Sequence, residues 1–219
     1  MDLTDFHPSH FMADPGHVRS IQRRFLRYFP EKGRVADLGC GVGVFLDLLR
    51  ESGRTGCGVD SFAEYIDLCR SRGHEAYCED IFTFLRSRPG QFDGVIGSHI
   101  IEHFHPKEGM DLLVGMRDLL RPGGILFLMT PSYHDLLVSS ERFWLDMSHI
   151  RPYPLPILDA MLSHLGMTIV DKGYDPKTRV RPAIYHPRSF YRYWMAKLRF
   201  GKYYDVGDTF IVARKEAGG

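Results

Sequence analysis

The sequence has few cysteines, and they are widely spaced. Cys40, Cys57, Cys69 and Cys78 are the four cysteines in 219 residues, and no two of them form a CxxC pair. Zinc sites usually take two ligands from one tight turn, and disulfide frameworks are typical of small secreted domains. Neither is expected here. We predict four reduced thiols, buried as small hydrophobic side chains.

Long apolar runs and an excess of charge are also lacking. The apolar runs, such as 125–129, end well short of the roughly 20 residues that cross a bilayer. Asp2 and Asp5 stand where a secretory signal would carry basic residues, so a cytoplasmic protein is expected. The 28 Lys and Arg against 27 Asp and Glu leave a formal charge of +1, with 44% hydrophobic residues. This balance excludes integral membrane, fibrous and disordered classes and favours one globular domain.

Short apolar runs alternate with helical patterns along most of the chain. Strand, crossover helix and strand in regular succession predict an α/β fold with a parallel sheet. The last two strands have no helix of clear crossover length between them, which predicts an antiparallel pair at the sheet edge. The predicted strands are 34–38, 55–59, 74–78, 92–97, 125–130, 167–173 and 209–213, and the predicted helices are 17–29, 42–50, 62–72, 81–86 and 110–120.

A glycine-rich turn follows the first predicted strand. Gly39, Gly41 and Gly43 occupy alternate positions directly before a predicted helix. Glycine permits positive φ and has no Cβ, so a ligand can lie against such a turn while backbone amides and the helix N-terminus face it. A dinucleotide-binding GxGxxG turn would need a third glycine where Val44 stands. The spacing therefore argues against NAD.

Acidic residues stand at the ends of the next two predicted strands. Asp60 follows the turn by about 20 residues, where a carboxylate can accept both hydroxyls of a ribose. Asp80, with Ile81, opens the following helix, where it suits an adenine base or serves as a helix N-cap. Ligands of open α/β sheets gather at the carboxyl ends of the strands. The three features together predict an adenosine site.

Five segments carry a resemblance to class I S-adenosylmethionine-dependent methyltransferases. Residues 35–43 resemble the first motif of this family, 58–60 its second-strand acid and 79–81 its adenine-contact motif. Residues 92–96 and 120–126 resemble its fourth strand and the turn before the fifth. The resemblance implies a Rossmann-like, seven-stranded, mostly parallel sheet with an antiparallel last strand pair and helices on both faces.

The same resemblance implies a cofactor and the residues that hold it. S-adenosyl-L-methionine is expected, with the glycine turn and the end of the fourth strand near its methionine portion, Asp60 at the ribose and Asp80 at the adenine. The residues implied are Asp37, Gly39, Cys40, Gly41, Asp60, Ser61, Asp80, Ile81, Ser98 and His99.

Two histidine-bearing segments follow the fourth and fifth predicted strands. Methyl transfer to a hydroxyl requires that the acceptor be held in line and that a base remove its proton. His99, Glu102 and His103 are spaced by three and four residues and would share a face if helical, and His149 lies in the second segment, 143–153. We predict His149 and His103 as base and acceptor contact, with Glu102 orienting an imidazole.

A metal is the alternative interpretation of these side chains. His99, Glu102, His103 and His149 offer nitrogen and oxygen ligands in a number that suits a divalent ion. Small-RNA and quinone O-methyltransferases carry a similar ExxEH metal motif. In this sequence His99 stands in the place of its first Glu. A histidine ligand at this position would favour zinc or manganese over magnesium. A divalent metal is kept as an alternative, and no metal site is predicted.

Residues 146–153 resemble the DPTHxRPY-type signature of bacterial methyltransferases that act on surface polysaccharides and related glycans. Met147 and Ser148 replace its Pro and Thr. The resemblance implies O-methylation of a sugar hydroxyl or a phosphate on a bacterial glycan or glycolipid precursor. Two alternatives are a small-molecule or quinone O-methyltransferase and a non-catalytic regulatory subunit that binds S-adenosylmethionine.

The segment 176–204 is locally basic, with eight Lys or Arg residues and no acid. The apolar side chains of the segment fall on one helical face, with arginines on the opposite face. This pattern suits peripheral contact with the inner face of an anionic membrane. An edge helix packed on the sheet is the favoured interpretation. Because no motif supports RNA binding, no nucleic-acid partner is expected. The predicted single domain, 1–219, divides into a helical cap (1–32), a cofactor-binding core (33–175), a basic aromatic insertion (176–206) and a final edge strand (207–215).

Overall fold

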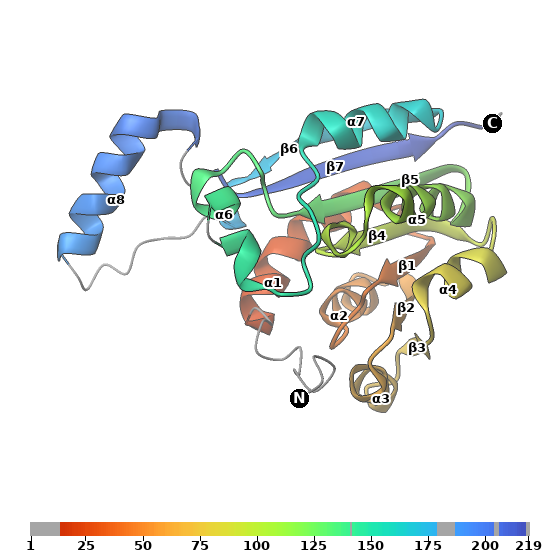
Figure 1. Cartoon of the computed structure of the whole chain (residues 1–219). Helices are drawn as coiled ribbons and strands as arrows, with labels where there is room; N and C mark the ends of the chain where they lie inside the picture. Colours follow the sequence, from red (N-terminus) through yellow and green to blue (C-terminus); the bar gives the residue numbers. More distant parts are fainter. Residues whose placement is uncertain (1–13, 141, 179–186, 204–205, 218–219) are drawn as a thin grey trace.

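The sheet has seven strands in the order β3-β2-β1-β4-β5-β7-β6 (Figure 1). The computed structural model describes residues 14–140, 142–178, 187–203 and 206–217. The first five strands pair in parallel, and β7 runs antiparallel to both of its neighbours, which confirms the predicted fold class. The strands are β1 (Arg34–Leu38), β2 (Thr55–Asp60), β3 (Glu75–Cys78), β4 (Phe92–Ser98), β5 (Leu120–Thr130), β6 (Met167–Asp175) and β7 (Asp208–Lys215).

Helices cover both faces of this sheet and enclose two apolar cores. On one face α4, α5 and α7 bury side chains such as Phe84, Leu112 and Leu158 against the strands. On the other face α1, α2 and α3 bury Ile21, Phe45 and Ile66. The α-helices are α1 (Pro15–Gln22), α2 (Val44–Glu51), α3 (Ala63–Ser71), α4 (Ile81–Ser87), α5 (Pro106–Leu119), α6 (Leu136–Ser140), α7 (Leu155–His164) and α8 (Pro187–Phe200), and the 3-10 turns are η3 (Arg23–Tyr28), η4 (Ile101–His103), η5 (Arg142–Leu145), η6 (Pro176–Thr178) and η7 (Gly201–Tyr203).

Most predicted elements lie within a few residues of the observed ones, but two helical segments and the exposure of one cysteine differ from the prediction. The helix predicted at 17–29 is α1 followed by the 3-10 turn η3, and α7 was not predicted at all. The prediction that all four cysteines are buried is wrong for Cys78, which is exposed while the other three are buried as free thiols. Cys78 ends β3, which is an edge strand of the sheet and has no neighbour on its outer side.

The helix α8 stands away from the sheet (Figure 1). Trp194 is 54% exposed and Leu198 is 82% exposed. The favoured interpretation of an edge helix packed on the sheet is therefore wrong. At β7 both sides of the sheet are already covered, by Leu158 and Leu162 of α7 on one side and by Phe25, which packs against Phe210, on the other.

The segment between η5 and α7 is fastened to α5 by Tyr153. Its ring is fully buried, and its hydroxyl donates to the carbonyl oxygens of Phe104 at 2.9 Å and His105 at 3.2 Å. A Cβ placed on Gly109 of α5 would lie 2.2 Å from that hydroxyl. Glycine at this position makes the room that the ring requires.

We expect Gly109→Ala to lower the free energy of unfolding by about 1–2 kcal/mol. Alanine gains helix propensity of about 1 kcal/mol, but overpacking a buried ring costs about 1–3 kcal/mol and a hydroxyl held by two carbonyls has little freedom to move. Gly173→Ala in β6 is the control, because its Cβ would meet nothing closer than 3.4 Å. Denaturant unfolding measures both. Equal stability of the Gly109→Ala variant and the wild type would contradict this packing.

Candidate active site

The glycine turn after β1 and the loop after β4 lie side by side at the carboxyl edge of the sheet. β1 and β4 pair in parallel with Leu38 opposite Gly97, so the chain leaves both strands at the same edge. A Cβ on Gly39 would lie 3.1 Å from Cδ1 of Ile100, which shows that the two loops touch. The predicted cofactor and acceptor segments therefore share one location.

The glycine turn is shaped by backbone conformations that favour glycine. Gly39, Gly41 and Gly43 have φ values of +69°, +50° and +76°. The amides of Gly39 and Cys40 donate to the carbonyl oxygen of Val59 at 2.9 and 3.1 Å, and the amide of Gly41 donates to Asp60. These amides point into the protein, unlike the expectation that they face a ligand, because the turn folds over the end of β2. Open space lies instead at Gly41, where a Cβ would meet nothing within 4 Å.

Asp60, at the end of β2, joins the turn to the start of α3. Its Oδ2 accepts the amide of Gly41 at 2.9 Å, and its Oδ1 accepts the amide of Phe62 at 3.0 Å. A carboxylate oxygen can accept more than one hydrogen bond, so both oxygens retain capacity for ribose hydroxyls. Beneath the turn, burial together with the nearby Cys69 and Asp60 raises the pKa of Asp37 well above its usual value. The open space at Gly41 and the fixed carboxylate of Asp60 fit a nucleoside cofactor.

The remaining predicted cofactor residues line the same edge. Asp80 Oδ1 accepts the amide of Thr83 at 2.9 Å, so Asp80 is the N-cap of α4, and its carboxylate is exposed at the end of β3. Ile81 is half-buried, packed against the core on the side of α4. Ser61 is exposed directly after β2, and Ser98 ends β4. The structure thus brings all ten of these residues to the carboxyl ends of four neighbouring strands.

His99 is held between two carboxylates. Its Nδ1 lies 3.4 Å from Oε1 of Glu102, and its Nε2 lies 3.3 Å from Oδ2 of Asp208, at the start of β7. Desolvation favours the neutral ring, but the two carboxylates outweigh it and raise the pKa of His99 well above its usual value. Among the described residues His99 is also the one non-glycine with positive φ, +55°. Strain of this kind is retained where surrounding contacts hold it, and functional sites often contain it.

Glu102 is the buried centre of the cluster. Oε2 accepts from the hydroxyl of Thr130 at 2.9 Å, and Oε1 lies between His99 and His149, 4.0 Å from Nε2 of the latter. Burial raises the pKa of a carboxyl, but the charged His99 more than compensates, and the pKa of Glu102 is lowered. The main-chain oxygen of Glu102 also accepts the amides of Ile150 at 2.8 Å and Arg151 at 3.2 Å. Glu102 therefore ties the second histidine segment to the first.

His149 is oriented by a backbone carbonyl. Its Nδ1 lies 2.7 Å from the oxygen of Phe143, an arrangement in which Nδ1 carries the proton and Nε2 presents a lone pair. That Nε2 is 3.7 Å from Oδ2 of Asp146. The ring centre of His103 lies 4.9 Å from the ring centre of His149. The Nδ1 of His103 is 3.0 Å from Oγ of Ser148.

Asp146, Ser148 and Asp208 complete the surroundings of these histidines, and sequence reasoning gave none of them a role. The first two lie in the segment that resembles the glycan-methyltransferase signature, where the amide of Ser148 donates to Asp146 Oδ1 at 2.9 Å. A polar pair next to His149 was a signal that could have been used. Asp208 contacts His99 because β7 lies between β5 and β6 in the sheet. No local sequence pattern indicates this strand order.

Three of the four residues that were considered as metal ligands lie close together. Glu102, His103 and His149 each offer one ligand atom, and these atoms lie within 4.8 Å of one another. Ligand atoms around a tetrahedral zinc ion lie about 3.4 Å apart, given bonds of about 2.1 Å. The three residues therefore lie close enough to be considered as ligands, with separations no greater than 4.8 Å. His99 instead faces Asp208 and Glu102.

Comparison with known proteins agrees with this geometry. Residues 10–172 match the family model described as a methyltransferase domain. A tRNA (carboxymethyluridine(34)-5-O)-methyltransferase of Mus musculus is 35% identical over 102 residues, covering 46% of this chain and 15% of that protein. A ubiquinone biosynthesis O-methyltransferase of Dinoroseobacter shibae is 27% identical over 139 residues, covering 57% of this chain and 55% of that protein. The chain thus matches only part of the length of these relatives.

A solved structure extends the likeness to the whole fold. The crystal structure of a SAM-dependent methyltransferase from Archaeoglobus fulgidus aligns with a TM-score of 0.76 at 24% identity, over 98% of this chain and 100% of that one. The chain belongs to the methyltransferase-domain family. S-adenosyl-L-methionine is the cofactor that the resemblance implies for it.

We expect Asp60→Asn to weaken binding of S-adenosylmethionine and of its demethylated product by about 10- to 100-fold, because hydrogen bonds to a charged carboxylate contribute about 1.5–3 kcal/mol. Isothermal titration calorimetry measures both affinities. Asp67→Asn on the exposed side of α3 is the control and should bind as the wild type does. Unchanged affinity in the Asp60→Asn variant, with wild-type stability, would contradict the ribose assignment.

Proposed function

We propose that this methyltransferase transfers its methyl group to oxygen and that His149 is the base. The observation that carries the proposal is the 2.7 Å contact of His149 Nδ1 with the Phe143 carbonyl, which leaves Nε2 free to take a proton. The names of the relatives from Mus musculus and Dinoroseobacter shibae both specify transfer to oxygen, which supports the same reaction class.

The proposed reaction is an in-line displacement with proton removal. S-adenosylmethionine supplies a methyl group on a sulfonium sulfur. His149 Nε2 accepts the proton of the acceptor hydroxyl as the oxygen–methyl bond forms and the methyl–sulfur bond breaks. The imidazolium that results lies 3.7 Å from a carboxylate oxygen of Asp146 and 4.0 Å from one of Glu102, and these charges stabilise it. His103, beside His149, is placed to contact the acceptor.

His99 is unsuited to the role of base. Both of its ring nitrogens face carboxylates, Nδ1 that of Glu102 and Nε2 that of Asp208, so neither is directed at an acceptor hydroxyl, and the same carboxylates raise its pKa. The charge on His99 instead keeps Glu102 ionised in a buried position. This division of roles makes His99 and Glu102 positioning residues and leaves His149 as the catalytic one.

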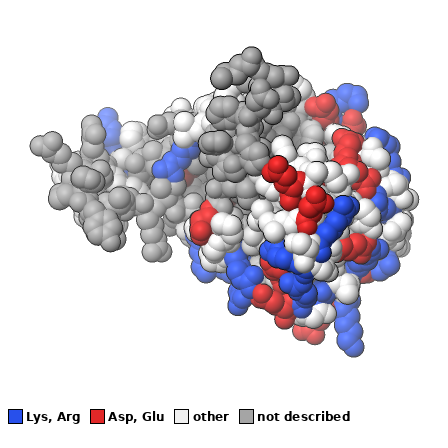
Figure 2. Space-filling view, turned by 90° about the horizontal axis from the view of Figure 1, so that it is seen from below, with Lys and Arg blue, Asp and Glu red and all other residues white. Residues whose placement is uncertain are grey.

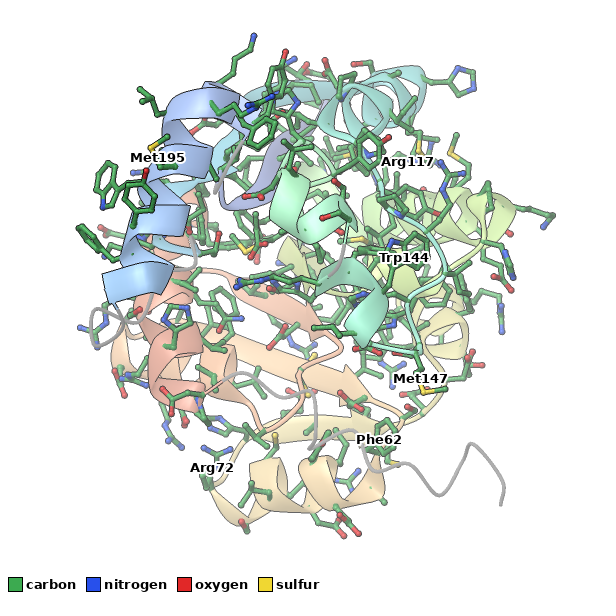
Figure 3. The ribbon with its side chains drawn as sticks, turned by 60° about the vertical axis from the view of Figure 1, so that its left-hand side comes forward. Phe62, Arg72, Arg117, Trp144, Met147 and Met195 are labelled. Carbon is green, nitrogen blue, oxygen red and sulfur yellow. The ribbon has the colours of Figure 1, made fainter. Side chains whose placement is uncertain are left out.

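The acceptor we propose is a hydroxyl or phosphate of a glycan or glycolipid precursor. The support is the signature-like segment 146–153, which contributes His149 to the cluster, and the apolar side chains beside it. Met147 of this segment is 66% exposed, and Trp144, just before it in η5, is 58% exposed (Figure 3). Apolar surface next to a polar reaction centre suits an acceptor with a polar reacting end and an apolar part. A quinone precursor is the second candidate, favoured by the Dinoroseobacter shibae relative.

We expect His149→Ala to reduce turnover about 100- to 10,000-fold, the usual contribution of a positioned general base, while cofactor affinity stays within twofold of the wild type. Release of the demethylated cofactor is the assay, with glycolipid extract, a demethylated quinone and unmodified tRNA as the acceptor panel. Methylation of the glycolipid extract is the expected result. Methylation of the quinone or the tRNA alone would assign the acceptor to that class.

The matched control for the base assignment is His164→Ala. His164 is exposed at the last turn of α7 and is not a member of the cluster, so its variant should retain full turnover. Normal turnover by the His149→Ala variant would show that another group removes the proton.

We expect turnover to survive treatment with a metal chelator. In the proposed step His149 takes the proton directly, so no metal-activated group is required. Assays before and after chelation, with metal analysis of the purified protein, test this. Loss of turnover that manganese or zinc restores would establish the metal alternative.

A further inference from the structure

The outer side of α8 carries a continuous apolar strip. Phe190, Trp194 and Leu198 follow one another at intervals of four residues, and Tyr191 and Met195 lie beside them at the same interval. Residues four apart lie on the same face of an α-helix. These five side chains are exposed by 45%, 54%, 82%, 65% and 46% in the order in which they are named. We call them the apolar strip of α8.

This strip points away from the body of the protein. Among the described side chains of α8, Tyr193, Ala196 and Lys197 are partly buried; Tyr193 and Ala196 lie on the opposite side of the helix, and Lys197 lies at the border of the strip. Met195 lies on the outer side of α8, remote from Trp144 and Met147 near the candidate active site (Figure 3). The most apolar side of the helix is thus the side that faces solvent, the reverse of the usual arrangement in a globular domain.

Positive charge borders the strip on both sides. In the helical period Arg199 lies next to Met195, and Lys197 lies next to Phe190. The segment 176–204 has eight Lys or Arg and no acid. On the face of the protein body seen in Figure 2, basic and acidic side chains are interspersed over the described surface. Charge of one sign is therefore a feature of the α8 segment.

We propose that α8 binds the surface of anionic phospholipid bilayers through its apolar strip. A helix with a large exposed apolar face, flanking Lys and Arg and aromatic rings is suited to the boundary between headgroups and acyl chains. Anionic headgroups complement the basic borders. Leu198 and Met195 favour lipid over RNA, because aliphatic side chains neither stack on bases nor bind phosphate. Within the described residues no helix is long and apolar enough to span a membrane, so the contact is peripheral.

Vesicle binding tests the proposal directly. The full chain should co-float with phosphatidylcholine vesicles that contain phosphatidylglycerol and bind at least about tenfold more weakly to pure phosphatidylcholine, because the basic borders require anionic lipid. Binding should weaken as salt rises. Absence of binding to the anionic vesicles at low salt would overturn the proposal.

Two variants locate the binding surface. Leu198→Asp combined with Met195→Asp should reduce vesicle binding at least about tenfold, since it places two acids in the strip. Ile157→Asp, which replaces a side chain of α7 with 45% exposure, should bind as the wild type does. Calorimetric binding of the demethylated cofactor should be unchanged in both, which distinguishes loss of the strip from loss of the fold. Equal vesicle binding by the double variant and the wild type would contradict the assignment to α8.

Fluorescence gives a second readout. The sequence has two tryptophans, so Trp144→Phe leaves Trp194 of the strip as the one emitter of this kind. Its emission should shift to shorter wavelength when anionic vesicles are added, because the indole leaves water. A single-stranded RNA oligomer should not compete with the vesicles. A shift produced by that RNA and not by vesicles would overturn the proposal and make α8 an RNA-binding helix.

Discussion

A buried carboxylate at the end of the sheet is the constraint around which the candidate active site is built. Glu102 is removed from water, and burial of an ionised carboxyl is costly unless charge and hydrogen bonds compensate. Compensation comes from His99 at 3.4 Å and from the hydroxyl of Thr130 at 2.9 Å. Asp208, from the last strand β7, stabilises the positive charge on His99. A single side chain thus makes the loop after β4 depend on β5 and β7.

The same residue positions the second histidine segment through its backbone. Its main-chain oxygen accepts the amides of Ile150 and Arg151, which immediately follow His149. Further along, Tyr153 fastens this segment to α5 with two hydrogen bonds. The chain is therefore fixed directly after His149, and the proposed role as a base requires this kind of positioning because the proton must be removed in one geometry.

Local patterns predicted the location of the proposed cofactor residues better than they predicted the surroundings of the histidines. Gly39, Asp60 and Asp80 each lie directly after a parallel strand, and parallel strands deliver their ends to one edge, so spacing along the chain was sufficient. The direction of the turn amides was not predictable, since it depends on the carbonyl of Val59 in a neighbouring strand. The contact of Asp208 with His99 was missed because it arises from the antiparallel pairing of β5 and β7, which is long-range.

The helix α8 shows where amphipathic patterns cease to predict structure. Apolar positions at helical spacing indicate that one face of the helix packs against another surface. They do not indicate which surface that is. The apolar face of α7 packs on β6 and β7. Leu158 of this helix lies in the core on one side of the sheet, and Phe25 lies in the core on the other side. The described side chains of α8 belong to neither core. The exposure of Leu198 shows that the described fold does not cover the strip.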